Sequence, residues 1–198
     1  MTEAFYKPIR GERPLDDFPP GTLAHREVAA FAVSEATGWR IVPPTVLRDG
    51  PFGPGMVQQW VEVDESVDVV GLVVEDDPLL RRIAVFDAIV NNTDRKGGHL
   101  LPVPGRHIHG VDHGVCFSPV PKLRTVLWGW RGERFVDAEI TVLRRVREAL
   151  DGDLGTELGG LLAPIEVTAT MRRVDRLLST GRFPQPGRNW PAVPWPPF

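Results

Sequence analysis

The sequence predicts an α+β fold with a small, strand-rich part first and a mostly helical part after it. Alternating or β-branched segments bounded by Gly and Pro fall before residue 63, and segments with helical apolar spacing dominate from residue 76 onward. An acidic stretch at 62–68 separates the two. We therefore predict a small β-rich lobe with one helix at 1–63, a helical lobe at 64–184, and a Pro- and Trp-rich tail at 185–198.

Composition excludes several classes of protein. With 198 residues the chain is long enough for a hydrophobic core, and its net charge of -3 gives no reason to expect nucleic acid as a partner. The single cysteine, Cys116, rules out an intramolecular disulfide and suits a reducing cytosol. The first residues lack a signal-peptide pattern, and no apolar run is long enough for a bilayer. We therefore expect a cytoplasmic protein without a transmembrane segment.

The strand-rich part contains one expected helix. It covers residues 22–36, with Thr22 as a candidate N-cap and Gly38 as its stop. Glu27 lies near its middle, and Lys7 lies on the first expected strand. The expected strands are short and separated by turns: residues 4–9, 41–47 and 55–63, the last two joined by the turn 48–54.

The helical part begins with an apolar, buried helix. Asp76 or Asp77 caps it, Pro78 lies in its first turn, and it runs to Val90. The segment 122–134, with two tryptophans and several cations, either faces a substrate or is a loop held by buried tryptophans, which we favour. The other expected elements are a hairpin of residues 100–103 and 108–111, helices at 137–150 and 164–179, and an extended tail whose aromatic residues pack on the body.

Two polar segments carry the candidate chemistry: NNTDRKGGH at 91–99 and GVDHG at 110–114. Asp94 follows the buried helix, His99 comes five residues later, and Asp112 follows the second strand of the hairpin. Kinases have the same order along the chain: a lysine on an early strand, a glutamate on the next helix, an aspartate in a loop and a later aspartate. In phosphoryl transfer these groups hold the phosphates, orient the nucleophile and bind a divalent metal.

Each of these residues also has a purely structural interpretation. Asp94 and Asp112 could cap turns, although the polar neighbours of Asp94 make a solvated turn a less complete explanation. Lys7 could be a solvated edge lysine and Glu27 a solvated helix glutamate, and we leave both readings open, as we do for His99. A zinc site is disfavoured because there is one cysteine and no HExxH pattern.

Four segments resemble an actinobacterial family described as phosphatidylinositol 3-/4-kinase-like: YKPIRGERP at 6–14, GTLAHREVA at 21–29, NNTDRKGGH at 91–99 and GVDHGVCF at 110–117. The resemblance covers essentially the whole chain. It implies an atypical kinase-like fold of two lobes, with ATP as the nucleotide. It also implies the following roles: Lys7 as the phosphate-binding lysine, Glu27 as its partner, Asp94 as the catalytic aspartate, Asp112 as a metal ligand, and Gln58, Gln59 and Trp60 at the adenine-contacting hinge.

The sequence departs from the kinase pattern in two respects. Too few residues precede Ala4 for a glycine-rich hairpin upstream of the lysine strand, which implies a minimal small lobe or an internal start. We expect weak nucleotide affinity or a more open phosphate site. His99 stands where kinases have asparagine, and imidazole is a poor ligand for magnesium and a better one for manganese. His99 therefore either joins a manganese-preferring site or hydrogen-bonds Asp94.

The sequence thus predicts an ATP-dependent phosphotransferase using Mg or Mn. Asp94 would orient the acceptor hydroxyl, Asp112 with His99 would hold the metal, and Lys96 or Arg95 could neutralise charge on the transferring group. The acceptor, a protein, a lipid or a small molecule, is not fixed by the sequence. Three alternatives stay open: a nucleotide-binding pseudokinase, a metal-dependent phosphohydrolase, and transfer of the nucleotide instead of the phosphate.

Overall fold

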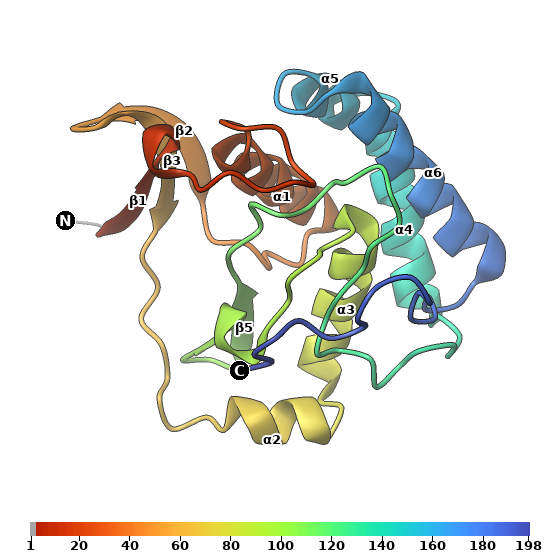
Figure 1. Cartoon of the computed structure of the whole chain (residues 1–198). Coiled ribbons are helices and arrows are strands. Elements are labelled where there is room, and N and C mark those ends of the chain that lie inside the picture. Colours follow the sequence, from red (N-terminus) through yellow and green to blue (C-terminus); the bar gives the residue numbers. More distant parts are fainter. Residues whose placement is uncertain (1–2) are drawn as a thin grey trace.

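An antiparallel sheet of three short strands forms one end of the molecule (Figure 1). The computed structural model describes residues 3–198, so Met1 and Thr2, which the sequence placed before the first strand, lie outside the described residues. The order is β1 (Ala4–Pro8), β3 (Gly53–Gln59), β2 (Thr45–Gly50). The β2–β3 hairpin is tighter than predicted, since pairing continues to Gly50 opposite Gly53, where φ is +94°.

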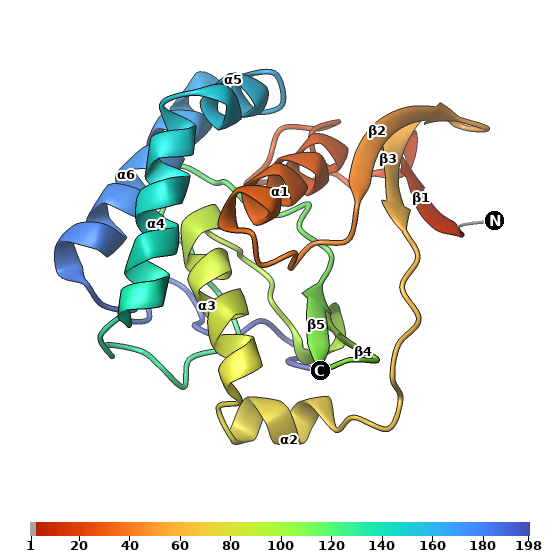
Figure 2. The ribbon, with the colours of Figure 1, turned by 180° about the vertical axis from the view of Figure 1, so that it is seen from behind.

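Helix α1 (Leu23–Thr37) lies between this sheet and the helices at the other end, as both views show (Figures 1 and 2). Small side chains on its buried face, such as Ala29, Ala30 and Val33, allow close packing. The helix ends at Gly38, whose φ of +67° is the left-handed cap that the sequence predicted. Its other end is capped differently from the prediction, as described for the site below.

The helical part confirms the predicted buried helix. Helix α3 (Pro78–Val90) is capped by Asp77, whose Oδ1 accepts the Leu79 amide at 2.8 Å, and Pro78 occupies its first turn. Two short helices, α2 (Val69–Val74) and α5 (Asp153–Gly159), were not predicted, because six or seven residues give too little periodicity to recognise. The helices of this part are α2 (Val69–Val74), α3 (Pro78–Val90), α4 (Asp137–Leu150), α5 (Asp153–Gly159) and α6 (Pro164–Thr180).

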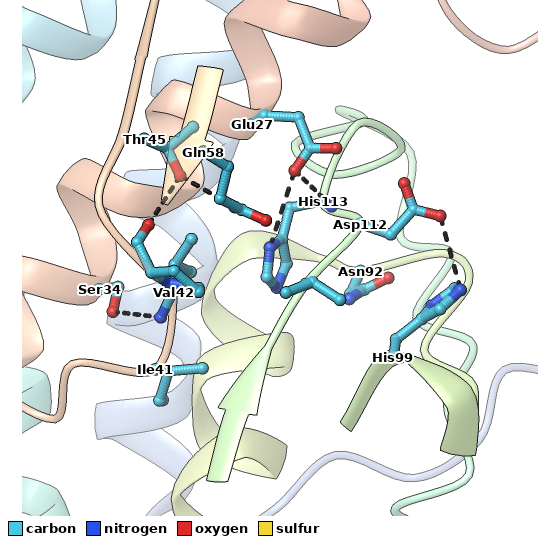
Figure 3. Close-up of polar contacts among 12 residues, drawn as sticks. Glu27, Ser34, Ile41, Val42, Thr45, Gln58, Asn92, His99, Asp112 and His113 are labelled. Atoms are coloured by element: carbon cyan, nitrogen blue, oxygen red, sulfur yellow. Dashed lines mark hydrogen bonds and ion pairs between the residues drawn. The ribbon is translucent and has the colours of Figure 1, made fainter. Parts of the chain in front are cut away.

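A two-stranded hairpin follows the loop after α3. Strands β4 (Leu100–Val103) and β5 (His107–Gly110) pair antiparallel, as predicted. One 3-10 turn, η2 (Gly97–His99), precedes the hairpin, and another, η1 (Ile9–Gly11), follows β1. The hairpin returns the chain towards α1, so Asp112 is carried to the helix that holds Glu27 (Figure 3).

The last seventeen residues are extended and return across the helical part to the β4–β5 hairpin (Figure 1). The Gly97 amide donates to the Pro197 carbonyl at 2.8 Å, and the Trp128 indole donates to the Ala192 carbonyl at 2.9 Å. Trp130 is buried, as favoured for the loop 122–134. The tail therefore packs on the body as predicted, although Trp195 is 86% exposed.

The predicted α+β class is confirmed: a small antiparallel sheet is followed by a mostly helical part that includes the β4–β5 hairpin. One continuous apolar core joins α1, α3, α4, α5 and α6. Within residues 3–198, no helix combines the length and the apolar character needed to cross a membrane.

Candidate active site

Lys7 and Glu27 form an ion pair between the sheet and α1. The Lys7 ammonium lies 3.2 Å from Glu27 Oε1, and Glu27 is only 2% exposed. Burial raises the pKa of Glu27, and the Lys7 charge with the His113 backbone N–H offsets this in part. Burial would lower the pKa of Lys7, but its carboxylate partners outweigh this, so the net direction is upward. Of the two readings left open for Glu27, the solvated one is wrong.

The N-terminus of α1 is capped by Glu12 and not by Thr22. The two carboxylate oxygens of Glu12 accept the Leu23 and Ala24 amides at 3.2 and 2.9 Å. The Thr22 hydroxyl instead donates to the Pro19 carbonyl at 2.7 Å. Glu12 satisfies free amides at the positive end of the helix, which stabilises its carboxylate there.

The loop 91–99 is fixed by a buried ion pair between Asp87 on α3 and Arg95. The guanidinium makes two bonds of 2.9 Å to the carboxylate, and both side chains are fully buried. Asn92 Nδ2 donates to the same carboxylate at 3.0 Å. Arg95 also donates to the Val111 carbonyl at 3.0 Å, so it ties the loop to the segment that carries Asp112. Arg95 is therefore not available to neutralise a transferring group, contrary to that expectation.

Asp94 lies at the mouth of this loop. Its backbone amide donates to Asn92 Oδ1 at 2.9 Å, which fixes the turn. Its carboxylate is 3.4 Å from the Lys96 ammonium, and both side chains are partly exposed. Asp94 and Lys96 are therefore open to a ligand while their backbone is held.

Asp112 meets two cationic or basic groups at once. Its Oδ1 is 2.8 Å from the Lys7 ammonium. Its Oδ2 is 3.5 Å from His99 Nε2 (Figure 3). Burial would raise the pKa of Asp112, but Lys7 foremost holds it below its usual value. Burial lowers the pKa of His99, and the charge of Asp112 offsets this only in part. The lowered pKa favours the neutral imidazole, which is the form that binds metals. Asp112 has a φ of +61°, an unusual value for a residue other than glycine.

His113 is a buried neighbour of the site. It is fully buried, and its Nε2 lies 2.6 Å from a terminal nitrogen of Arg95. Arg95 can only donate, so this ring nitrogen is the acceptor. Burial, followed by the Arg95 charge, lowers the pKa of His113 well below its usual value. A neutral His113 thus helps to orient Arg95, which is a structural role.

Four of the predicted residues line one pocket of about 350 Å³: Lys7, Glu27, Asp94 and Asp112. Glu12 also lines it, so the wall carries four carboxylates and one ammonium. His99 and Lys96 are not in the wall, but each contacts an acid that is. An anionic ligand would meet net negative charge here unless a cation accompanied it.

The donor set suits a divalent metal with few protein ligands. His99 Nε2 and Asp112 Oδ2 face each other, and both atom types bind Mn²⁺, whereas Mg²⁺ prefers the carboxylate alone. In the described part of the chain, no group of three or more His, Cys, Asp or Glu side chains is assembled for a metal. A metal at His99 and Asp112 would therefore need further ligands from a phosphate or from water.

The three residues predicted at the hinge lie outside the pocket wall. Gln58 is buried, and its side chain donates to Thr45 Oγ1 at 2.9 Å (Figure 3). The backbone N–H groups of Gln59 and Trp60 already donate to the Pro44 and Glu3 carbonyls, at 2.8 and 3.0 Å respectively. An adenine contact through these amides would require both bonds to break, so this role stays a prediction.

Sequence reasoning missed two residues that build the site, Glu12 and Asp87. Asp87 is the one charged residue in the otherwise apolar second half of α3, residues 83–90, and a charge in such a place needs a buried partner. That signal was present in the sequence, although it did not identify Arg95 as the partner. Glu12 acts eleven residues away from the amide it caps, and no local pattern predicts this contact.

The fold and the pocket together define an α+β protein with an acid-lined pocket between a small sheet and helix α1. The chain belongs to the family of Protein Rv2133c of Mycobacterium tuberculosis, with which it is 41% identical over 228 residues, covering 98% of this chain and 82% of that protein. No family model matches the chain. The resemblance to phosphatidylinositol 3-/4-kinase-like proteins therefore stays a prediction.

Among solved structures, one described as the golgi casein kinase is similar to this chain with a TM-score of 0.46 and 16% identity. The similarity covers 90% of this chain and 66% of that one. At these values it assigns neither an activity nor a substrate.

Proposed function

We propose that the chain is an ATP-dependent phosphotransferase of the atypical, phosphatidylinositol-kinase-like class. It would transfer the γ-phosphate to a hydroxyl of a protein, a lipid or a small molecule. One observation carries the proposal: a single pocket gathers Lys7, Glu27, Asp94 and Asp112 from four separate segments. A lysine–glutamate pair facing two loop acids, in this chain order, is what phosphoryl transfer by kinases uses.

The contacts support the following roles. Glu27 holds the Lys7 ammonium at the pocket wall, where Lys7 would exchange its contact with Asp112 for phosphate oxygens. Asp112 and His99 would hold Mg²⁺ or Mn²⁺, which would supply neutralisation of the triphosphate charge. Asp94 would accept a hydrogen bond from the acceptor hydroxyl, and Lys96 beside it would offset developing charge.

The test is incubation of the pure protein with γ-labelled ATP and Mg²⁺ or Mn²⁺, beside Asp94→Asn. We expect label on the protein that is lost in Asp94→Asn and kept in Asp49→Asn, an exposed acid on β2. Free labelled phosphate without labelled product would favour the phosphohydrolase. ATP binding without either signal would favour the pseudokinase.

The metal assignment is tested in the same assay with His99→Asn. If His99 is a ligand, the ratio of activity with Mn²⁺ to activity with Mg²⁺ should fall by roughly tenfold. His107→Asn is the matched control, because His107 lies on β5 away from the pocket. A clear Mg²⁺ preference that His99→Asn leaves unchanged would contradict this role.

A further inference from the structure

A second and larger cavity, of about 730 Å³, is lined by residues of α6, the segment 119–123 and the tail at 184–190. It shares no lining residue with the acid-lined pocket. Its volume falls within the range of sites that bind small organic molecules.

The lining of this cavity contains four cations and no acid. Lys122 is already engaged, since it pairs with Asp17 and its ammonium lies 3.9 Å from the centre of the Trp190 ring. Arg172 and Arg176 are exposed and four residues apart, so they extend from the same face of α6. Across residues 3–198, neither has a carboxylate within ion-pair distance.

The third arginine, Arg173, is held in one orientation by neutral groups. Its Nε and Nη1 donate to the Ile89 and Ser118 carbonyls at 3.0 and 3.1 Å, and its Nη2 donates to Thr170 Oγ1 at 2.8 Å. These bonds use three of the five N–H groups of a guanidinium, so one remains on each terminal nitrogen. Burial without a carboxylate partner lowers the pKa of Arg173 to about 10. The side chain is thus fixed and cationic, and no carboxylate of the described residues lies within ion-pair distance of it.

Apolar groups stand beside the arginines in the same cavity. Leu123 and Leu177 line it, Ile165 is 65% exposed and Trp190 is 40% exposed. Three arginines favour a dianion with three acceptor oxygens over a carboxylate with two, because each fork can bind its own oxygen pair. The apolar wall favours a hydrophobic group attached to that anion.

We propose that this cavity binds a phosphate monoester carried on an apolar or aromatic group. Arg172, Arg173 and Arg176 hold the phosphate, while the wall of Leu123, Ile165 and Trp190 covers the apolar group. The shared chemistry admits two sources, a soluble ester and a lipid headgroup. Because the two cavities have no residue in common, this site does not depend on the proposed phosphotransferase activity.

Phenyl phosphate is the soluble probe, and phosphatidic acid in phosphatidylcholine vesicles is the lipid probe. Binding of phenyl phosphate to the full chain is followed by NMR on the Trp190 indole N–H, assigned with Trp190→Phe. Inorganic phosphate and benzyl alcohol serve as the two halves of the ligand. The variant Arg172→Gln/Arg176→Gln removes two charges on the cavity, and Arg48→Gln/Arg144→Gln removes two exposed charges elsewhere.

We expect phenyl phosphate to bind more tightly than either half, and Arg172→Gln/Arg176→Gln to weaken it by roughly tenfold or more. The control pair should change binding less than about twofold. Thr168→Trp, which fills the cavity without changing its charge, should also abolish binding. If the wild-type chain co-sediments with the phosphatidic acid vesicles and Arg172→Gln/Arg176→Gln does not, the natural ligand is assigned to a lipid headgroup.

Three results would overturn the proposal. The first is that neither probe binds to the wild-type chain. The second is that the cavity variant and the control pair weaken binding equally, and the third is that inorganic phosphate binds as tightly as phenyl phosphate. Either of the last two would mean that only general surface charge is sensed.

Discussion

At the residue scale, the candidate site depends on charges that lie close together but are not equally buried. Glu27 is almost fully buried, whereas its partner Lys7 and the nearby Asp112 are about half exposed. Lys7 therefore connects a buried carboxylate to one that solvent and ligands can reach. The Lys7 ammonium can therefore exchange Asp112 for a phosphate and still stay paired with the buried Glu27.

The burial of His113 predicts a pH dependence of stability. Its pKa is well below the usual value in the folded chain, whereas in the unfolded chain it is about 6.5. Below that pH the unfolded chain binds a proton that the folded chain does not, so stability falls as the pH decreases. The slope from this group approaches about 1.4 kcal/mol per pH unit.

Urea unfolding of metal-free protein between pH 7.5 and 5.5 measures that slope. In His113→Gln the amide can still accept the Arg95 hydrogen bond but does not titrate, so the slope should be smaller than in the wild type. Val85→Ala, a fully buried apolar site, should lose stability and keep the wild-type slope. Equal slopes in His113→Gln and the wild type would contradict this account.

At the element scale, α1 carries Glu27 and is anchored at its start by Glu12. Replacing Glu12 with Ala leaves the Leu23 and Ala24 amides without a carboxylate and should cost about 1 kcal/mol of unfolding free energy. Thr22→Ala should cost less than about 0.5 kcal/mol, because its hydroxyl does not bind the helix amides. Chemical denaturation of both variants compares them, and a larger loss for Thr22→Ala would count against the cap.

Prediction from sequence succeeded where the signal is local and failed where it is not, as for the cap of α1. The long apolar helix α3, the αL glycine after α1 and the β4–β5 hairpin each follow from a local pattern, and they were found. The cap of α1 depends on a contact across eleven residues, and α2 and α5 are too short to show a period. The order of Lys7, Glu27, Asp94 and Asp112 along the chain suggested a shared site, and the four residues line one pocket. The sequence contains no spacing that would have shown that Arg95 is buried.

The buried ion pair between Asp87 on α3 and Arg95 in the loop 91–99 should contribute strongly to the free energy of unfolding. Asp87→Asn leaves the Arg95 charge buried without a counter-ion, which should cost about 3–5 kcal/mol. Asp175→Asn breaks the exposed pair with Arg147 and should cost less than about 1 kcal/mol. Equilibrium unfolding in urea provides the comparison.

A loss of that size is a large part of the stability of an ordinary domain. The double variant Asp87→Asn/Arg95→Gln is the control, because it removes both buried charges and should recover part of the loss. If the double variant were less stable than Asp87→Asn by the full effect of Arg95→Gln alone, the two residues would not be coupled.

At the scale of the whole molecule, residues about one hundred positions apart meet where the tail crosses the loop 91–99. The Phe198 ring packs against Gly97, where a Cβ atom would overlap the ring. The Gly97 amide donates to the Pro197 carbonyl at 2.8 Å, so side-chain packing and a backbone bond act at the same point. The tail is thus placed to steady the turn between Asp94 and His99.

A double-mutant cycle measures this link. Gly97→Ala should destabilise the wild-type chain by about 1–3 kcal/mol, because the added methyl displaces the ring. In the Phe198→Ala background the same change meets an open space and should cost at least about 1 kcal/mol less. Faster hydrogen exchange of the Gly97 amide in Phe198→Ala would show that the turn itself loosens when the ring is lost. Equal costs of Gly97→Ala in both backgrounds, with unchanged exchange, would mean that the tail lies on the loop without holding it.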